Sequence, residues 1–314
     1  MADGSAAGPL VALTGGTGFV GRHIIERAAR NGFRLRILAR DPSRLPSLPP
    51  KTEVTSGDLA DPRALGELVA GADAVVHAAG SVRGVTRAQF DRVNAAGSRA
   101  CVRAAQAAGV PRFLQISSLA AREPTLSPYA ASKRAGEEEA LALANELAVT
   151  VIRPPAVYGP GDREMLPLFR LMARGYAPVF GRADARFSLL FVTDLADAVV
   201  SWARVAAAPT GIFEPDDGTA GGYDWPRVCE TVAGLTGRPV RSLRLPAALL
   251  ALPAGFNALA GRLSSFSPML TPGKIRELRH PDWVCEPGGI TEALDWRPAF
   301  DLRAGLLETP GWRD

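Results

Sequence analysis

A glycine-rich turn close to the N-terminus constrains the fold of this chain more than any other feature. A short apolar run at residues 9–13 predicts a buried strand, the sequence TGGTGFVG (14–21) follows at once, and a helical pattern covers residues 19–31. Glycine at positions 15, 18 and 21 permits a tight turn and lets the backbone approach a pyrophosphate while the helix packs close to the strand. The N–H groups that open the helix would then face phosphate oxygens. This order of strand, turn and helix predicts a dinucleotide-binding fold.

The remainder of the first half repeats the alternation of strand and helix. Strand patterns occupy residues 34–39, 52–56, 74–77, 112–116 and 150–153, and helical patterns occupy residues 62–70, 88–108 and 128–147. Such alternation is typical of parallel βαβ units. The predicted fold class is therefore α/β, a Rossmann doubly wound parallel sheet.

After Arg153 the alternation becomes irregular, and proline and glycine become frequent. Strand character returns at residues 187–192, and a further helix is expected from Asp194. Loop-rich regions of this kind often carry substrate-binding residues. We therefore expect a dinucleotide-binding Rossmann domain over residues 1–158 and a smaller, interleaved C-terminal region over residues 159–314. This second region is expected to be mainly substrate-binding and to return in part to the Rossmann sheet, at about residues 187–215.

Charge and cysteine content argue against several classes of protein. The formal net charge is +4, but the arginines are dispersed among acidic residues and form no basic tract, so we expect no nucleic-acid partner. Cys101, Cys229 and Cys285 are far apart, which favours neither a disulfide framework nor a metal site. No basic stretch precedes the first apolar run, so we expect no signal peptide. The expectation is a soluble, cytoplasmic protein without a bound metal.

One uncharged segment, at residues 245–262, has two interpretations. Pro246, Pro253, Gly255 and Asn257 make it a poor membrane-spanning helix. It could form core helices or a lid over the substrate. It could also contact a membrane surface peripherally, which would bring the protein to the inner face of the membrane.

The end of the second predicted strand bears on the choice of cofactor. NAD-preferring sites place an acidic residue there to bind the ribose hydroxyls, whereas this chain has Arg40, followed by Ser43 and Arg44. A guanidinium can bind a 2′-phosphate through two hydrogen bonds. We therefore predict that NADP(H) is preferred. NAD(H) stays open as an alternative, because Asp41 could reach the ribose if the register differs by one residue.

Tyr129 and Lys133 begin a predicted helix at a spacing that puts them on one face, one turn apart. A free phenol ionises near pH 10, but a nearby ammonium and an oxidised nicotinamide favour the phenolate. Tyr129 could then exchange a proton with an alcohol or a nascent alkoxide. Ser118 follows a predicted strand, where α/β sheets build their sites, and its hydroxyl could orient the substrate oxygen. Ser117 is the alternative for that role, and either serine could instead be a buried cap.

Together these motifs resemble the extended short-chain dehydrogenase/reductases, the epimerase/dehydratase and 3β-hydroxysteroid dehydrogenase-like group. The resemblance covers nearly all of residues 9–313. The segments that carry it are TGGTGFVG (14–21), GDL (57–59), HAAG (77–80), Asn94 before Gly97, SS (117–118), YxxxK (129–133), RPPAVYGPGD (153–162) and FVTDLADA (191–198).

The resemblance implies roles for individual residues. Catalysis would be carried by Ser118, the second serine of its pair, with Tyr129 and Lys133. The cofactor would be bound by Gly15, Thr17, Gly18, Phe19, Val20, Gly21, Arg40, Asp58, Leu59, Ala78, Ala79, Gly80, Asn94, Tyr129, Lys133, Pro154, Ala156 and Val157. Within this set the resemblance places Asp58 and Leu59 at the adenine, and residues 154–157 beside the nicotinamide. Asn94 could alternatively be a hydrogen-bonding residue of its helix. The resemblance also implies a homodimer formed through the helices at residues 88–108 and 128–147.

The chain departs from the sugar-modifying members of that group. They usually follow the serine pair with Val-Tyr-Gly, whereas this chain has Leu119 to Arg122, and the acidic partners of the dehydratases are missing there. The apolar last third is more similar to relatives that act on steroid-like or long-chain lipid ketones, since an apolar substrate needs an apolar wall. The main hypothesis is an NADPH-dependent ketoreductase for a bulky apolar 3-oxo substrate, steroid-like or sphingolipid/acyl-chain-like. The alternatives are a nucleotide-sugar epimerase with tightly bound NAD and a non-catalytic NADP(H)-binding subunit.

Overall fold

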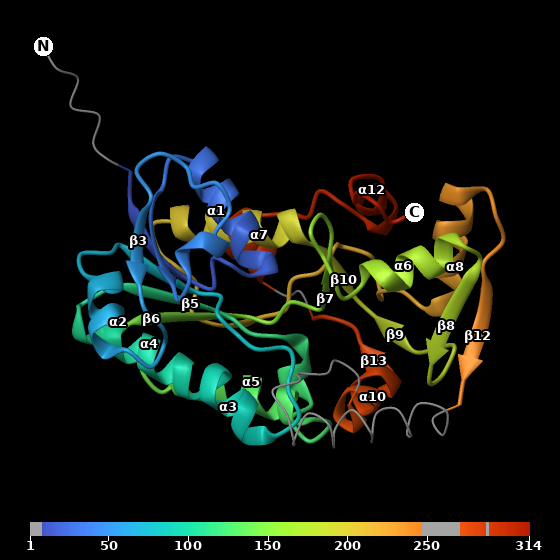
Figure 1. The fold of residues 1–314 in the computed structure, drawn as a ribbon, viewed down its shortest axis with the longest axis horizontal. Coiled ribbons are helices and arrows are strands. Elements are labelled where there is room, and N and C mark those ends of the chain that lie inside the picture. Colours follow the sequence, from blue (N-terminus) through green and yellow to red (C-terminus); the bar gives the residue numbers. More distant parts are fainter. Residues whose placement is uncertain (1–7, 247–270, 287–288) are drawn as a thin grey trace, which may run out of the picture.

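The computed structural model describes residues 8–246, 271–286 and 289–314. In this part of the chain a seven-stranded parallel sheet forms the centre, in the order β11-β6-β5-β4-β1-β2-β3 (Figure 1). Its strands are β1 (Leu10–Thr14), β2 (Arg34–Ala39), β3 (Glu53–Ser56), β4 (Ala74–His77), β5 (Arg112–Ile116), β6 (Ala148–Ile152) and β11 (Gly211–Phe213). The order changes direction between β1 and β4, and sheets of this kind bind ligands at the carboxyl ends of the strands beside such a point. The predicted Rossmann fold is confirmed.

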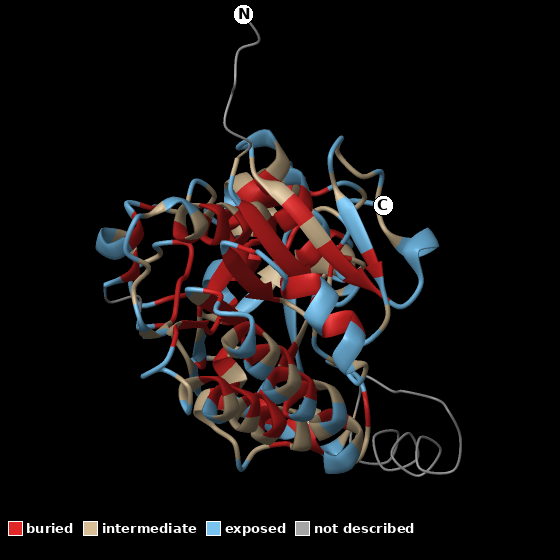
Figure 2. Ribbon diagram, turned by 90° about the vertical axis from the view of Figure 1, so that its left-hand side faces the viewer, coloured by how far each residue is buried: buried red, intermediate tan, exposed pale blue. Residues whose placement is uncertain are grey.

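Helices cover both faces of the sheet because its strands are apolar on both sides. Figure 2 shows the buried strands lying between the helical layers. One face, which includes Leu13 and Ile37, packs against α1, α7 and α11. The other face, which includes Val75 and Phe113, packs against α2, α4 and α5, and α3 lies along α4 and α5. The bounds are α1 (Phe19–Arg30), α2 (Pro62–Val69), α3 (Arg87–Asn94), α4 (Ala96–Ala107), α5 (Pro128–Leu141), α7 (Val192–Arg204) and α11 (Ile290–Leu294).

The C-terminal elements form a smaller part of the molecule, at the right of Figure 1. Its apolar cluster includes Phe169, Phe191 and Trp312. Three short parallel pairs, β10 with β7, β12 with β8, and β13 with β9, replace a continuous sheet. The elements are β7 (Ala156–Tyr158), α6 (Leu166–Ala173), β8 (Tyr176–Phe180), β9 (Arg186–Phe187), β10 (Leu189–Phe191), α8 (Trp225–Thr236), β12 (Arg241–Leu245), α10 (Pro272–Arg279), β13 (Asp282–Trp283) and α12 (Leu302–Leu307).

The single long helix expected at residues 88–108 is wrong: the structure has α3 and α4, which meet at Ala95. The backbone carbonyl of Asn94 accepts a hydrogen bond from the Ser98 hydroxyl at 2.7 Å and lies against Gly136 of α5. Sequence periodicity continues through this point because both helices bury the same side. The helix expected at residues 128–147 ends earlier, at Leu141, and turns fill the remainder.

Residues 187–192 do not form one strand, because Ser188 separates β9 from β10. The Ser188 hydroxyl donates to Asp216 at 2.9 Å and accepts from the backbone N–H of Cys285 at 3.1 Å. Within the stretch 187–215, only β11 pairs with the seven-stranded sheet, beside β6, while β10 pairs with β7 outside it.

In the described residues, no helix has the length and apolar character needed to cross a membrane. The contact with a membrane surface through residues 245–262 stays a prediction, since only Leu245 and Pro246 of that segment are described. The homodimer also stays a prediction.

Candidate active site

The glycine-rich turn joins β1 to α1 at the carboxyl edge of the sheet. Gly15 has a φ of +79°, and a Cβ atom on it would lie 2.5 Å from the carbonyl carbon of Ala78. Gly18 precedes α1, and no side chain caps the first N–H groups of that helix. A backbone free of side chains and an open helix N-terminus fit the pyrophosphate of a dinucleotide. Thr17 in the turn and Phe19 and Val20 at the start of α1 are partly exposed.

The segment after β4 lies directly against this turn. The Thr14 hydroxyl accepts a hydrogen bond from the N–H of Ala79 at 3.3 Å and is 2.8 Å from Nδ1 of His77. At Gly80 an added Cβ would lie 3.6 Å from Nζ of Lys133. The cofactor turn and the predicted catalytic helix therefore meet across Ala78, Ala79 and Gly80.

Asn94 is buried, and its hydrogen bonds join the segment after β4 to α5. Its amide nitrogen donates to the carbonyl of Ser81 at 3.0 Å and to the hydroxyl of Ser132 at 2.9 Å, and its amide oxygen accepts from the N–H of Ser81 at 2.8 Å. Ser132 is the residue before Lys133. Asn94 thus positions the residues around the expected nicotinamide site rather than acting only within its own helix.

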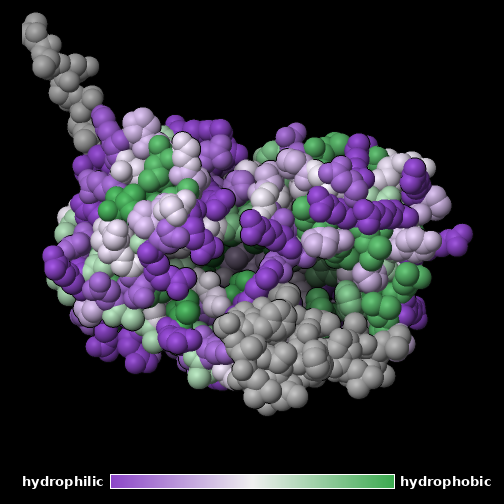
Figure 3. Space-filling model, viewed as in Figure 1, coloured by the Kyte–Doolittle hydropathy of each residue, from purple (hydrophilic) through white to green (hydrophobic). Residues whose placement is uncertain are grey.

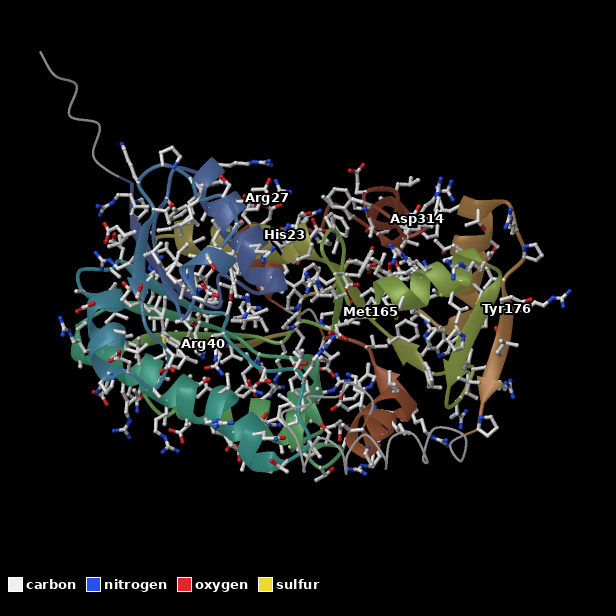
Figure 4. All side chains as sticks on the ribbon, in the orientation of Figure 1. His23, Arg27, Arg40, Met165, Tyr176 and Asp314 are labelled. Carbon is white, nitrogen blue, oxygen red and sulfur yellow. The ribbon has the colours of Figure 1, made fainter. Side chains whose placement is uncertain are left out.

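Arg40 directly follows β2 and is exposed, at the carboxyl edge of the sheet (Figure 4). The Asp41 carboxylate instead caps the short helix η1 (Pro42–Arg44): it accepts from the N–H of Ser43 at 3.1 Å and from its hydroxyl at 2.6 Å. These bonds, chiefly the one from the hydroxyl, lower the pKa of Asp41. The acidic group at this edge is therefore engaged in a local turn, while the Arg40 guanidinium faces solvent.

Asp58 and Leu59, expected at the adenine, lie after β3 on the same edge. The Asp58 carboxylate accepts from the N–H of Ala60 at 2.8 Å, which fixes the turn. Leu59 packs on α4 at Gly97, where an added Cβ would lie 2.6 Å from Leu59 Cδ1. Leu59 thus has a packing contact that a role at the adenine alone would not require.

Tyr129 lies on the first turn of α5, partly buried, with its ring 5.8 Å from that of Phe90 in an edge-on arrangement. Burial raises the pKa of Tyr129 to about 12, a hydrogen bond with Ser118 opposes the rise, and the Glu277 carboxylate adds to it. The sequence led us to expect that Lys133 lowers the pKa of this phenol. In the protein chain alone desolvation is the largest influence on this pKa, so Tyr129 is protonated at neutral pH.

Lys133 is buried one turn further along α5, and its Nζ donates to the carbonyl of Ile116 at 2.9 Å. Burial lowers the pKa of Lys133 to about 8, and the neighbouring Glu137 carboxylate opposes the shift. Its charge also helps to lower the pKa of His77, mainly a consequence of burial, to about 3. Lys133 therefore supplies the positive charge at this position, and His77 is neutral.

The structure distinguishes the two adjacent serines. Ser117 is buried, and its hydroxyl donates to Oε1 of Glu137 at 2.5 Å. Ser118 is partly exposed, accepts from the N–H of Ala120 at 3.2 Å, and has the side chain that bonds to Tyr129. The Ser118 hydroxyl therefore lies beside Tyr129 at a partly exposed position, whereas Ser117 has an internal partner.

Residues 154–157 complete this edge of the sheet. The N–H of Leu119 donates to the carbonyl of Pro154 at 2.9 Å, which ties this segment to the Ser118 turn. Ala156 is exposed and Val157 is partly buried in β7. Figure 3 shows that the surface is hollowed between the Rossmann part and the C-terminal part.

A buried ionic cluster lies behind α5, and the sequence motifs did not predict it. Arg153 donates to both oxygens of Glu137, at 2.8 and 2.6 Å, and to Glu214 at 3.3 Å. Arg122 also reaches Glu214, at 3.4 Å, and donates to the carbonyl of Val284 at 2.8 Å. The cluster joins α5, the ends of β6 and β11, and the C-terminal part. The i, i+4 spacing of Lys133 and Glu137 puts both residues on one face of α5, and this spacing could have indicated that Glu137 is buried beside the site.

Lys274 and Glu277 of α10 form a pair that contacts the start of α5, which only the structure shows. Lys274 Nζ donates to Glu277 at 2.9 Å, and Glu277 also accepts a hydrogen bond from the Ser127 hydroxyl. Ser127 is the N-cap of α5. About 150 residues separate Ser127 from Glu277, so local sequence patterns carry no sign of the contact.

A comparison with protein families finds that residues 11–213 match the model described as "NAD dependent epimerase/dehydratase family". Among characterised proteins, the chain is 40% identical over 305 residues to a ceramide reductase of Caulobacter vibrioides, covering 96% of this chain and 94% of the relative. It is 31% identical over 225 residues to a 3 beta-hydroxysteroid dehydrogenase/Delta 5-->4-isomerase of Mycobacterium tuberculosis, covering 62% of this chain and 60% of the relative.

Solved structures share the fold at low sequence identity. MoeE5, determined in complex with UDP-glucose and NAD, aligns with a TM-score of 0.73 at 22% identity, covering 97% of this chain and 98% of that one. Epimerase Mth375 from Methanothermobacter thermautotrophicus aligns with a TM-score of 0.75 at 21% identity, covering 97% of this chain and 92% of that one.

Proposed function

The chain belongs to the NAD-dependent epimerase/dehydratase family and is an oxidoreductase-type enzyme, and on that premise we propose that it is an NADPH-dependent reductase of a bulky, apolar 3-oxo lipid. The observation that carries the proposal is the grouping of Ser118, Tyr129 and Lys133 beside the glycine-rich turn, in a chain that matches a ceramide reductase along almost its whole length. A sphingolipid-like ketone is the substrate class that this relative favours over a steroid.

The residues divide the chemistry between them. Bound NADPH supplies the hydride that reduces the carbonyl carbon. Ser118 donates a hydrogen bond to the carbonyl oxygen, and Tyr129 transfers its phenolic proton to that oxygen as negative charge develops. Lys133 would bond the nicotinamide ribose and stabilise the phenolate that remains. A phenol whose pKa is raised to about 12 is fully protonated at neutral pH, which suits a proton donor in the reductive direction.

Turnover of defined ketones tests this function. NADPH oxidation would be followed with a 3-oxo sphingolipid, a 3-oxo acyl chain, a 3-oxo steroid and UDP- or dTDP-sugars, each with NADH in parallel. We expect turnover with the sphingolipid or acyl ketone and none with the sugars. Copurified NAD together with conversion of a nucleotide sugar would instead establish the epimerase alternative.

The two alternatives have less support. A subunit that only binds NADP(H) would not need a tyrosine and a lysine together beside the cofactor turn, whereas this chain has Tyr129 and Lys133 there. The epimerase is favoured by solved structures at 19–22% identity, which share the fold, whereas the ceramide reductase matches at 40% identity over 305 residues. The screen separates all three, since a binding subunit would bind NADPH and turn over nothing.

Replacement of Arg40 by glutamate tests the cofactor preference. The carboxylate would repel a 2′-phosphate where a guanidinium can bind it, so Arg40→Glu should weaken NADPH binding by about tenfold or more. NADH binding should change much less, as titration of both cofactors would show. Arg303→Glu, an exposed arginine on α12, is the matched control. Equal weakening of both cofactors by Arg40→Glu would refute the preference for NADPH.

A further inference from the structure

α10 lies against the first turn of α5, the helix that carries Tyr129 and Lys133. Nε of Arg276 donates to the carbonyl of Leu126 at 2.7 Å. At Gly273 an added Cβ would lie 2.9 Å from the Cβ of Ser127, so the two elements approach as closely as glycine allows. α10 is thus held directly on the turn from which α5 begins.

Glu277 is the polar centre of this contact and is only 5% exposed. Its carboxylate accepts from the Ser127 hydroxyl, and that hydroxyl in turn accepts from the N–H of Ala130 at 2.9 Å as the N-cap of α5. The indole N–H of Trp283 donates to the Glu277 backbone carbonyl at 2.8 Å, which fixes the end of α10. A rigid path therefore leads from Glu277 through Ser127 to the turn that holds Tyr129.

Lys274 is the partner that balances the charge of Glu277. Its Nζ lies 2.9 Å from Oε2 of Glu277, and its side chain is 33% exposed while that of Glu277 is 6% exposed. Unlike the exposed ion pairs of this chain, this pair has one member inside the protein, where charges act over longer distances than in water.

Among the described residues, the carboxylate of Glu277 on α10 acts on the Tyr129 phenol, and Lys274 of the same helix is paired with that carboxylate. Lys133 comes from the helix of Tyr129 itself, with its ammonium bonded to the carbonyl of Ile116. His77 lies beyond Lys133 and is neutral because its pKa is lowered to about 3. Phe90 of α3 and the Ser118 hydroxyl are the uncharged neighbours.

We propose that Glu277 is a positioning residue for the reaction: through Ser127 it fixes the turn of α5 that holds Tyr129, and the Glu277–Lys274 pair sets the balance of charge around the phenol. The inference rests on the proposed function, in which Tyr129 exchanges the proton. The negative member favours the protonated phenol that reduction needs. Lys274 offsets part of this effect of Glu277, so that Tyr129 can also lose its proton when the alcohol is oxidised.

Two substitutions that act in opposite directions test the proposal. Glu277→Gln keeps an acceptor for Ser127 but removes the negative charge, so the pKa of Tyr129 should fall. Lys274→Met leaves the Glu277 charge unbalanced, so the pKa should rise. Alcohol oxidation with NADP⁺, measured well below that pKa, requires the phenolate. Its rate should therefore increase about threefold to tenfold in Glu277→Gln and decrease by a similar factor in Lys274→Met, where tenfold corresponds to one pKa unit.

A control variant and a second readout separate this proposal from the function itself. Arg279→Met removes an exposed positive charge from the same helix and should leave the oxidation rate unchanged. The pKa of Tyr129 can also be followed without turnover, by NMR of ring-labelled tyrosine with Tyr129→Phe used to assign the signal. That titration keeps its meaning even if no ketone proves to be a substrate.

Opposite shifts in the two variants, seen by NMR and in the oxidation rate, support the proposal. If both variants lose activity alike, or if the Tyr129 signal titrates as in the parent protein, the role of the pair is only structural and the proposal is overturned. Opposite NMR shifts with no ketone turnover would retain the pair and reject the proposed function.

Discussion

Replacing Tyr129 by phenylalanine should reduce ketone reduction by about 10²- to 10⁴-fold, the range that a well-placed general acid supplies. The substitution removes the proton donor but keeps the ring that packs 5.8 Å from Phe90, so the fold and the cofactor turn should persist. NADPH affinity should therefore stay close to that of the parent protein. The measurements are NADPH oxidation with a reducible ketone and a binding titration with the cofactor.

Tyr176→Phe is the matched control, because it removes the same hydroxyl from an exposed tyrosine on β8, far from Arg40 in Figure 4. It should leave the reduction rate unchanged. The serine pair adds a second comparison: Ser118→Ala should slow turnover at normal stability, while Ser117→Ala should mainly cost stability by leaving Glu137 without one of its donors. Full activity in Tyr129→Phe would contradict the acid assignment.

The largest effect on stability is expected from Arg153→Met. Arg153 and Glu137 are 8% and 1% exposed at their side chains, and methionine would leave the Glu137 carboxylate buried without its bidentate partner. Breaking a buried pair from one side typically costs about 3–5 kcal/mol. The free energy of unfolding, taken from urea titrations, should fall by that amount.

Two further variants qualify this result. Arg63→Met breaks the pair with Glu67, whose side chains are 89% and 55% exposed, and should change the free energy of unfolding by about 1 kcal/mol or less. Arg153→Met combined with Glu137→Leu removes both charges and should recover part of the loss. A small effect of Arg153→Met alone would mean that water reaches the Glu137 carboxylate, and the cluster would then not be the buried support described above.

Much of the Rossmann core follows from local patterns, because a buried parallel strand is a short apolar run and its helix has a clear period. The break at Ala95 does not follow from them, since it depends on Ser98 and on the approach of Gly136 from another helix. The division at Ser188 has the same origin, in bonds to Asp216 and Cys285. Tertiary contacts decide both cases, and neither leaves a mark on the periodicity.

In the candidate site, too, local patterns predicted some features and tertiary contacts decided the others. Short-range spacing identified the glycine-rich turn and the Tyr129–Lys133 pair, both of which lie where α/β sheets bind ligands. Local patterns left Ser117 and Ser118 both open and only the family resemblance favoured Ser118, because the physical difference between them is the hydrogen bond from Ser117 to Glu137. The raised pKa of Tyr129 was also beyond the sequence, since burial and the distant Glu277 produce it.

The pairing of β11 with β6 limits where the C-terminal region of such an enzyme could be replaced by that of another. Residues 211–213 complete one border of the sheet, and α7 covers a face of it, although both follow the first C-terminal elements along the chain. A fragment cut after residue 158 would lack both and would expose apolar surface. Grafting a new specificity region by simple fusion at that point should therefore fail, whereas loops inserted between β7 and β10, or after β11, leave the sheet whole.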